Sequence, residues 1–313
     1  MEYRSLGRSG LQVSAVGLGC NNFGRRCDQE QTTAVVQKAL ELGITFFETA
    51  DIYGPRGLSE EFLGKALQGH RREALIATKF VGPMGEGPLW GGASRRYIIE
   101  AAEASLERLG TDHIDLYQVH FPDARTPSEE TLRALDDLVR QGKVRYIGCS
   151  NYAGWQVVES QWITRTEHLS PLISAQNQYN LLDRRIEREL VPASKAYGLG
   201  ILPYFPLASG FLTGKYRSGE SPPEGTRLAA GQMGARILTE ENFETLSKLE
   251  GFAATAGHTM LELAIGWLAS QPHVASVMAG ATKPEQVEQN VKAAEWRLTT
   301  EELAEVDTIT RRG

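Results

Sequence analysis

The stretch IDLYQVHFPDARTPSEETLRALDDLVRQGKVRYIGCS (114–150) contains a complete strand–helix–strand pattern. Its two ends, IDLYQVH (114–120) and VRYIGCS (144–150), are short apolar runs rich in β-branched or aromatic residues, as expected of strands buried on both faces. Between them, apolar residues from Leu132 to Val139 recur at helical spacing and predict an amphipathic helix. The pattern is typical of a parallel sheet whose strands are connected by helices.

The predicted helix also has recognisable ends. Thr126-Pro127-Ser128-Glu129 is a capping box with proline at the first helical position, and Gly142 is placed to end the helix in the left-handed conformation. Signals of the same kind mark the ends of other predicted helices at Gly43, Ser94, Gly110, Gly198 and Thr299–Glu302.

Similar apolar runs recur outside this stretch, with helical patterns between them. They are VSAVGLG (13–19), ITFFETA (44–50), ALIATKF (74–80), LISAQNQ (172–178), GILPYFP (200–206) and ASVMAG (275–280). Eight strands separated by helices can form either an open doubly wound sheet or a closed barrel. We favour an α/β fold of the (β/α)8 TIM-barrel type, because there are eight runs and because polar residues follow nearly every one of them.

Before the first of these strands, EYRSL and LQVS flank Gly7-Arg8-Ser9-Gly10. This arrangement predicts a β-hairpin, and we expect it to cap the N-terminal end (the bottom) of the barrel. No low-complexity stretch or linker rich in proline and serine divides the chain. We therefore expect a single barrel domain over residues 1–313.

Composition limits the classes of function. Hydrophobic residues make up 41% and charged residues 23% of the chain, as in ordinary globular proteins. A net charge of −6 without long basic runs argues against binding to nucleic acid or to an anionic membrane. Cys20, Cys27 and Cys149 fit neither a disulfide framework nor a zinc site, and we expect no metal. Without a signal peptide or a long apolar segment, the default location is the cytoplasm.

Four chemically active side chains lie where successive predicted strands end. Glu48 lies near the end of the run 44–50, and Tyr53 follows that run. Lys79 lies at the end of the run 74–80 next to Phe80, and His120 ends the run 114–120. In a (β/α)8 barrel these strand ends meet at one rim. Polar residues at other strand ends are Ser150, Asn151, Gln176, Tyr204, Lys283, Gln286 and Asn290.

A phenol, an ammonium, a carboxylate and an imidazole together predict general-acid chemistry. The ammonium should stabilise the phenolate and lower the pKa of the phenol, while the carboxylate keeps the ammonium charged and in place. A neutral imidazole can donate a hydrogen bond to the oxygen that the phenol protonates. Such a site suits a developing alkoxide, as in carbonyl reduction, and it needs a bound redox cofactor to supply hydride.

Several further motifs occur in an order that resembles the aldo-keto reductase superfamily, over essentially the whole chain. They are EYRSLGRSGLQVSAVGLG (2–19), ETADIYGPRGLSEEFLGKAL (48–67), GTDHIDLYQVHFPD (110–123), RYIGCSNY (145–152), AQNQYNLLDR (175–184), ILPYFPLASGFLTGKY (201–216) and AGATKPEQVEQN (279–290). The chain is similar to bacterial and plant members, including the branch that resembles channel auxiliary subunits.

The resemblance implies that Tyr53 is the proton donor, Lys79 its partner and His120 the residue that orients the carbonyl. The fourth residue of the family's set is an aspartate, but Glu48 stands at this position. Two outcomes are open: the barrel accommodates the longer side chain, or the ion pair to Lys79 is weakened. Asp51 is not the replacement, because the family often carries an acid there as well.

The resemblance also implies a nicotinamide cofactor. It assigns Ser150, Asn151 and Gln176 to the carboxamide and Tyr204 to stacking on the ring. The expected contacts to the rest of the cofactor are Pro206, Leu207, Gly210, Lys215, Gly280, Thr282, Lys283, Gln286, Gln289 and Asn290. We expect NADPH, with NADH as the alternative, because Lys283 stands where many relatives have an arginine near Thr282.

Three functions follow from these observations. The first is NADPH-dependent, reversible reduction of small aldehydes and ketones to alcohols, with Phe23 and Trp90 as substrate contacts. The second is a cofactor-binding auxiliary protein with weakened catalysis, which Glu48 would favour. The third, a lyase that forms a Schiff base on Lys79, ranks last because Glu48 would raise the pKa of the lysine.

Overall fold

A computed structural model describes residues 1–223, 226–229 and 232–311. Within this part of the chain, eight parallel strands form one sheet in the order β10-β3-β4-β5-β6-β7-β8-β9. The strands are β3 (Val16–Gly19), β4 (Phe46–Glu48), β5 (Leu75–Phe80), β6 (Ile114–Val119), β7 (Val144–Ser150), β8 (Leu172–Gln178), β9 (Gly200–Tyr204) and β10 (Val277–Gly280).

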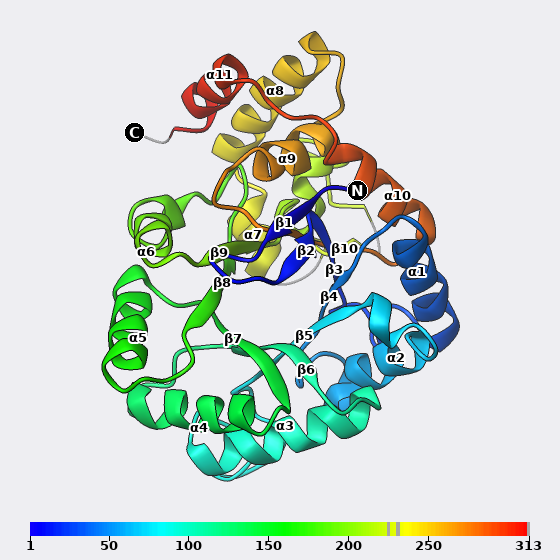
Figure 1. Cartoon of the computed structure of the whole chain (residues 1–313). Coiled ribbons are helices and arrows are strands. Elements are labelled where there is room, and N and C mark those ends of the chain that lie inside the picture. The colour runs from blue at the N-terminus through cyan, green and yellow to red at the C-terminus, as the bar shows by residue number, and fades with distance from the viewer. Residues whose placement is uncertain (224–225, 230–231, 312–313) are drawn as a thin grey trace.

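The sheet curves into a barrel that is almost closed (Figure 1). Its last strand, β9, meets the segment before β10 through a parallel bridge between Ile201 and Val274. On either side of this bridge, Ile201 N–H donates to His273 O and Ala275 N–H donates to Ile201 O, both at 2.9 Å. The predicted (β/α)8 barrel is therefore confirmed, and the open doubly wound sheet is excluded.

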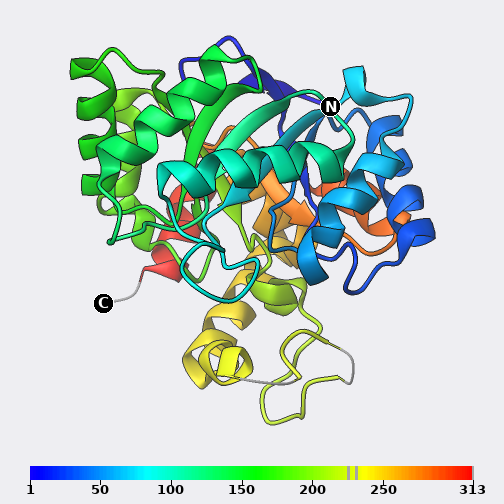
Figure 2. The same cartoon turned by 90° about the horizontal axis from the view of Figure 1, so that it is seen from below.

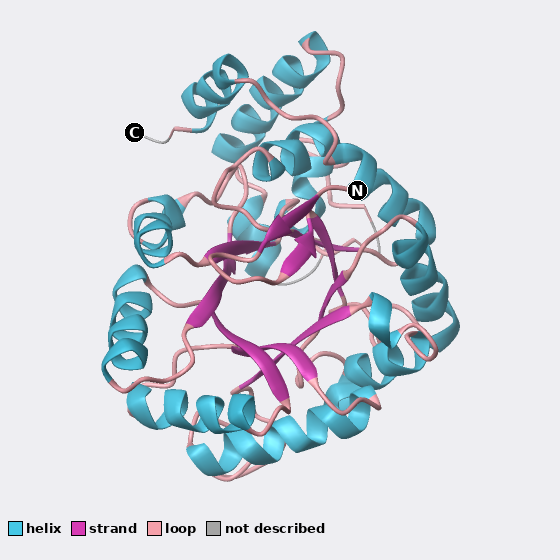
Figure 3. Cartoon of the chain, viewed as in Figure 1, coloured by secondary structure: helices cyan, strands magenta, loops and turns pink. Residues whose placement is uncertain are grey.

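Helices surround the strands as an outer layer (Figure 3). They are α1 (Gln29–Glu41), α2 (Leu58–Ala66), α3 (Arg95–Leu109), α4 (Ser128–Arg140), α5 (Gly154–Thr166), α6 (Leu190–Tyr197), α7 (Gln232–Ile237), α8 (Glu240–Thr255), α9 (Met260–Ala269), α10 (Pro284–Ala293) and α11 (Thr300–Thr310). In the described ranges, no helix has both the length and the apolar character needed to span a membrane.

The predicted hairpin is present as β1 (Tyr3–Ser5) paired antiparallel with β2 (Gln12–Ser14). Leu6, which directly follows β1, and Val13, which lies in β2, are both fully buried. Both pack against the apolar side chains at the bottom of the barrel. The long segment after β9 projects from the opposite side of the molecule (Figure 2). One end of the barrel is thus closed by the hairpin, and the other end carries the longer loops.

Several strands are shorter than the predicted runs, and the first run is divided between two strands. The run VSAVGLG (13–19) does not form one strand: its first two residues belong to β2, and the barrel strand β3 begins only at Val16. The physical reason is that Val13 and Ser14 pair with β1, whose partners in the hairpin they are. Hydrophobic periodicity alone does not separate β2 from β3, because only Ala15 lies between them.

Most of the predicted helix ends are confirmed. Ser94 and Thr299 accept hydrogen bonds at their helix N-termini, and Gly110 ends α3 at a φ of 62°. The glycines predicted to end other helices, Gly43, Gly142 and Gly198, also have positive φ angles.

The capping box at Thr126 is wrong. Helix α4 begins at Ser128, with Pro127 as its N-cap residue. The hydroxyl of Thr126 instead donates to the carboxylate of Asp123 at 3.0 Å. That carboxylate also accepts from Ala93 N–H, so it orders the loop before the helix.

Apolar side chains fill the lower part of the barrel interior. Phe46, Ala77, Leu116 and Leu202 come from four different strands and are fully buried in this cluster. Polar interior positions occur towards the carboxyl ends of the strands, for example Gln118 and Gln176. The interior is therefore packed at one end and polar at the other, which confines chemistry to the C-terminal rim.

Candidate active site

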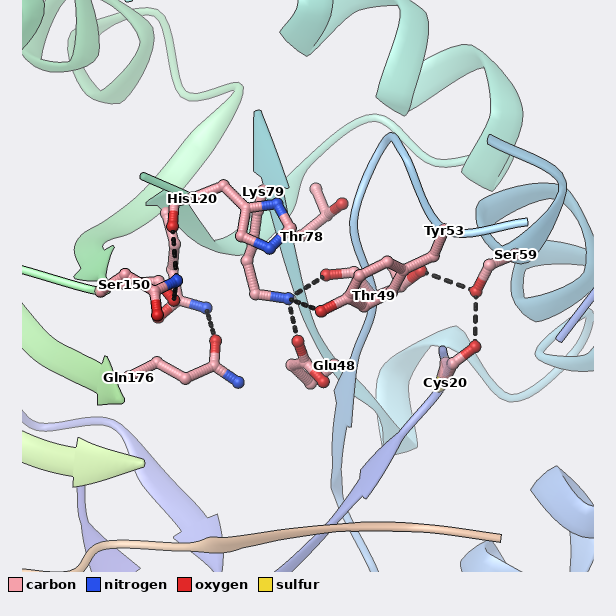
Figure 4. A network of polar contacts seen from close by, with 12 residues as sticks. Cys20, Glu48, Thr49, Tyr53, Ser59, Thr78, Lys79, His120, Ser150 and Gln176 are labelled. Carbon is pink, nitrogen blue, oxygen red and sulfur yellow. Dashed lines mark hydrogen bonds and ion pairs between the residues drawn. The ribbon is translucent and has the colours of Figure 1, made fainter. Parts of the chain in front are cut away.

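Three neighbouring strands bring the four predicted catalytic side chains together (Figure 4). Glu48 ends β4, Lys79 lies in β5, and His120 directly follows β6. Tyr53 lies in the turn after β4, whose backbone is held to the next strand by Asp51 N–H donating to Lys79 O at 3.1 Å. The parallel register of β4, β5 and β6 thus places these side chains at one edge of the barrel.

The ammonium of Lys79 is the centre of this group. It forms an ion pair with the carboxylate of Glu48 and also donates to Thr49 O at 2.8 Å and to Tyr53 Oη at 3.1 Å. Lys79 is only 1% exposed and Glu48 only 4% exposed. These three acceptors match the three donors of an ammonium, so the buried charge is fully hydrogen-bonded.

The longer side chain of Glu48 is accommodated without loss of the ion pair. Gly19 lies beside Glu48 in the β3–β4 register, and a Cβ atom there would be 3.5 Å from Glu48 Oε2. The missing side chain of Gly19 therefore leaves space next to the carboxylate. The sequence left two outcomes open, and the structure shows the first: Glu48 and Lys79 form the ion pair.

The pKa of Tyr53 differs from the expectation of a lowered value. Burial raises the pKa of this phenol to about 12, although the charge of Lys79 acts in the opposite direction. The expectation was wrong because the loss of solvent around the phenolate outweighs the attraction of the neighbouring ammonium. Tyr53 consequently keeps its proton throughout the neutral range.

Lys79 and His120 differ in charge at neutral pH. Burial by itself lowers the pKa of Lys79, but the Glu48 carboxylate and the hydrogen bonds to Glu48 and Tyr53 raise it above the ordinary value. Burial, with the charge of Lys79, lowers the pKa of His120 to about 2. The lysine is therefore an ammonium and the imidazole is neutral at physiological pH.

The neutral ring of His120 lies between two aromatic neighbours. It meets the ring of Tyr53 edge-on, with centroids 5.7 Å apart, and stacks on Phe121 with centroids 4.2 Å apart. Its Nδ1 atom is buried and has no hydrogen-bond partner among the described residues. The ring is thus fixed by packing rather than by a carboxylate.

A second polar network adjoins this group. Asn151 donates to His120 O at 2.9 Å and accepts a hydrogen bond from Tyr204 Oη at 2.6 Å. Gln118 donates to Gln176 Oε1 at 3.0 Å, so the NH₂ end of Gln176 points away from this contact (Figure 4). The side chains at the ends of β7, β8 and β9 are therefore ordered relative to His120.

Most of these side chains line one cleft of about 840 Å³ at the C-terminal rim, although Gln118 does not. The predicted site residues that line it are Glu48, Tyr53, Lys79, His120, Ser150, Asn151, Gln176, Tyr204, Pro206, Leu207, Gly210, Lys215, Gly280, Thr282, Gln286, Gln289 and Asn290. A second cavity of about 1020 Å³ shares Phe205 and Ser209 with this cleft. None of the four predicted catalytic residues lines the second cavity.

Three predicted contacts do not line the cleft. Phe23 is fully buried in the core, so the interpretation of this residue as a substrate contact is corrected: hydrophobic burial holds it away from any ligand. Trp90 is 55% exposed in the loop between β5 and α3, outside the cleft lining. Lys283 is exposed at the N-cap of α10, also outside the lining.

The cleft also contains residues that the sequence analysis missed. They are Gly19, Asn21, Asn22, Arg26, Phe121, Thr226, Arg227, Leu261 and Met278. The guanidinium of Arg227 donates to Asn22 Oδ1 at 2.7 Å and to Asn21 Oδ1 at 3.3 Å. Arg227 is more than 200 residues from β3 in sequence, so no spacing rule could have joined it to Asn22. Phe121, next to His120, could have been found from its position.

The donor set of the cleft fits a dinucleotide. The cleft offers amide and hydroxyl groups at one end, and the cations Lys215, Arg26 and Arg227 elsewhere along it. Amide donors suit a carboxamide, and cations suit phosphate groups. In the described ranges, no group of three or more His, Cys, Asp or Glu side chains could hold a metal ion.

Comparison with known proteins agrees with this geometry. The model of the Aldo/keto reductase family matches residues 15–311. The chain is similar to a probable voltage-gated potassium channel subunit beta of Oryza sativa subsp. japonica (37% identical; 94% of this chain and 91% of the relative). It is also similar to L-glyceraldehyde 3-phosphate reductase of Escherichia coli O157:H7 (37%; 98% and 92%). Versiconal hemiacetal acetate reductase of Aspergillus parasiticus is 35% identical (97% and 95%). The chain therefore belongs to the aldo/keto reductase family, a family of NAD(P)H-dependent oxidoreductases.

Proposed function

We propose that this protein reduces small aldehydes and ketones to alcohols, reversibly, with NADPH as the hydride donor and Tyr53 as the proton donor. The observation that carries the proposal is the 3.1 Å hydrogen bond from Lys79 Nζ to Tyr53 Oη beside the buried ion pair with Glu48. The names of two relatives, both reductases, support the same class of reaction.

Tyr53 holds the proton that the reaction needs. Its raised pKa keeps the phenol protonated at neutral pH, which is the form required for reduction. When the proton leaves, the ammonium of Lys79 lies within hydrogen-bond distance to stabilise the phenolate. Glu48 keeps Lys79 charged and fixed, so Glu48 and Lys79 act on the reaction through Tyr53.

His120 positions the carbonyl oxygen. Because its imidazole is neutral, one ring nitrogen carries a hydrogen that can be donated, without a positive charge that would compete with Lys79. The edge-on contact with Tyr53 directs both side chains to the same region of the cleft. We infer that the carbonyl oxygen binds between the Tyr53 hydroxyl and the His120 ring, where it accepts the proton.

NADPH, when bound, supplies the hydride from C4 of its nicotinamide. Ser150, Asn151 and Gln176 would hold the carboxamide, and Tyr204 would lie against the ring, since these side chains line the cleft next to His120. Further along, Lys215 and Arg227 would hold the phosphates. These contacts would orient the nicotinamide ring relative to the substrate.

The rim next to His120 favours substrates with an apolar or aromatic group. Phe121 lines the cleft, stacks on His120 and is still 41% exposed, so its ring is available to a ligand. Trp90, exposed in the neighbouring loop, would add a second aromatic contact if that loop closes over the substrate. We therefore assign small aromatic or apolar carbonyl compounds as the substrate class.

The proposal is tested with purified protein, NADPH and a reactive aromatic aldehyde. We expect tryptophan emission to be quenched on addition of NADPH, followed by oxidation of the NADPH at 340 nm once the aldehyde is added. The alcohol should accumulate in a 1:1 ratio to the NADPH consumed. Binding without any turnover, over a panel of aldehydes and ketones, would contradict the proposal.

A second candidate is an auxiliary protein that binds the cofactor with little turnover. It is favoured by the similarity to a protein named as a potassium channel subunit beta and by the glutamate at position 48. The formed ion pair between Glu48 and Lys79 weighs against it. A lyase that uses Lys79 as a nucleophile is disfavoured, because the pKa of this lysine is raised. Borohydride trapping of a carbonyl compound on Lys79 without NADPH would revive it.

A further inference from the structure

The outer face of helix α5 carries an exposed apolar stripe, formed by Trp155, Val158 and Trp162. These side chains are 59%, 36% and 61% exposed. Because they are three and four residues apart, they lie on one side of the helix. None of them lines the active-site cleft or the second cavity. The stripe is therefore separate from the site that the proposed function uses.

Helix α5 has the reverse of the usual amphipathic pattern. Its buried positions are Gly154, Val157, Ser160, Gln161 and Thr164. Gln161 Nε2 donates to Leu172 O at 2.7 Å, so a polar contact ties the helix to β8. A helix that only covers a barrel is expected to turn its largest apolar side chains inward. Two tryptophans on the outer face therefore indicate a further partner on that side.

Two charged groups that form no ion pair flank the stripe. Glu189, which precedes α6, accepts from Trp155 N–H at 3.2 Å, so its carboxylate lies at the start of α5. Arg165 lies in the last turn of the same helix. Both side chains are exposed, and neither is paired with an opposite charge among the residues that the structure describes. The outer face thus carries a negative charge at its first turn and a positive charge at its last turn.

These features match a second copy of the same helix laid antiparallel across the first. Trp155 and Trp162 are two helical turns apart, about 10 Å along the axis. A twofold axis near Val158 would set Trp155 of each chain against Trp162 of the other copy, and Arg165 beside Glu189 of the other copy. The exposed acid nearest this axis, Glu159, accepts from Ser128 Oγ at 2.9 Å and is held on the side of α4. The face is therefore complementary to itself in both apolar contact and charge.

We propose that this protein forms a twofold homodimer through the outer faces of two antiparallel α5 helices. Tryptophan is enriched among the residues that contribute most of the binding free energy of an interface, and four indoles would form the centre of this one. The two indoles of each chain expose roughly 300 Å², whereas a stable interface buries about 800 Å² of each partner. The outer faces of α4 and α6, which lie on either side of α5 (Figure 1), would supply the rest.

The first test measures mass by sedimentation equilibrium over a range of concentrations. We expect the wild type to have twice the mass of one chain, and the double variant Trp155→Gln/Trp162→Gln to be a monomer, with its dimer Kd raised at least about 100-fold. Trp90→Gln is the matched control, because it removes an indole of similar exposure (55%) from another part of the surface, and it should stay dimeric. Circular dichroism should show the same helix content in all three proteins.

The second test asks whether Arg165 and Glu189 of different copies meet. Arg165→Glu and Glu189→Arg each bring two like charges together, so each variant alone should dimerise about 10-fold more weakly than the wild type. An equimolar mixture of the two variants should form a heterodimer of nearly wild-type affinity, because each charged position then faces its opposite. Within one chain the two positions lie at opposite ends of α5, roughly 15 Å apart, so this recovery can arise only between chains.

Other results would overturn the proposal. A wild type that stays monomeric at roughly 100 µM would exclude a dimer of useful affinity. A dimer that survives the loss of both tryptophans would be formed by another face. A mixture of the charge variants that stays as weak as its components would contradict the antiparallel arrangement. A monomeric wild type that sediments with phosphatidylcholine vesicles would mean that the stripe binds a lipid surface instead.

Discussion

The carboxylate of Glu48 contacts the ammonium of Lys79 inside the barrel, where neither side chain has more than 5% of its surface exposed. Two charges at such a depth lose most of their hydration, and their attraction repays this only if the remaining donors are satisfied. Thr49 O and Tyr53 Oη satisfy the other two hydrogens of the ammonium. The pair is therefore a fixed element of the site, and its loss should affect both stability and catalysis.

Glu48→Gln tests the contribution of the carboxylate charge. The variant leaves the ammonium of Lys79 buried without its counter-charge, so we expect the free energy of unfolding to fall by about 3–5 kcal/mol. The reduction rate should fall as well, because an unpaired lysine at this depth tends to lose its proton. Urea denaturation and kcat for an aromatic aldehyde measure the two effects.

Glu48→Asp is the matched control, since it keeps the charge and shortens the side chain. Because the glutamate already reaches Lys79, we expect kcat to stay within about threefold of the wild type and stability within about 1.5 kcal/mol. A several-fold gain in kcat would contradict the view that the barrel accommodates the longer side chain, and would identify Glu48 as a handicap.

Tyr53→Phe removes the proposed proton donor while keeping the ring. We expect kcat/KM for aldehyde reduction to fall by about 10²–10⁴-fold, the usual contribution of a general acid. The dissociation constant for NADPH, measured by tryptophan quenching, should change by less than about twofold. Tyr146→Phe is the control: Tyr146 packs at the bottom of the barrel, and its variant should keep the wild-type rate. A Tyr53→Phe protein with an unchanged rate would remove Tyr53 from the mechanism.

The fold was largely predictable because the strands are buried on both faces. The observed bounds of β7 and β8 coincide with the apolar runs 144–150 and 172–178, where turn residues flank a continuous run. The prediction failed where a residue pairs or bonds with a different element from the one expected. Val13 belongs to the hairpin rather than to the barrel strand, and Thr126 bonds to Asp123 instead of capping α4.

The site was predictable where it depends on strand ends and unpredictable where it depends on distant loops. Glu48, Lys79 and His120 were found because the fold brings the carboxyl ends of neighbouring strands together. Arg227 could not be found, since only the folded chain carries it to Asn22. The pKa of Tyr53 could not be found either, because burial depends on everything packed around the ring.

The correction at Phe23 leads to a paired prediction with Trp90. Phe23 is fully buried, so Phe23→Ala should lower the free energy of unfolding by about 3–5 kcal/mol, as large-to-small changes in a core do. Trp90 is 55% exposed, so Trp90→Ala should leave the melting temperature nearly unchanged and raise KM for an aromatic aldehyde. Thermal unfolding and steady-state kinetics of both variants separate the two roles. A stable Phe23→Ala protein with an altered substrate preference would restore the original interpretation.

A half-buried histidine away from the site predicts how stability depends on pH. Burial, with the nearby charge of Lys195, lowers the pKa of His273 to about 4, and neither ring nitrogen has a hydrogen-bond partner among the described residues. An unfolded chain would hold this proton with a pKa of about 6.5, so the folded state binds fewer protons between pH 4 and pH 6.5. The contribution of His273 to the free energy of unfolding is therefore complete above pH 6.5 and is lost as the pH falls, by roughly 2 kcal/mol at pH 5.

His273→Gln removes this titration, and its melting temperature should fall less than that of the wild type between pH 7 and pH 5. Between pH 7 and pH 8, where the imidazole is neutral in both states, the difference between the two proteins should stay constant. An equal fall in both proteins towards pH 5 would show that His273 is not protonated on unfolding.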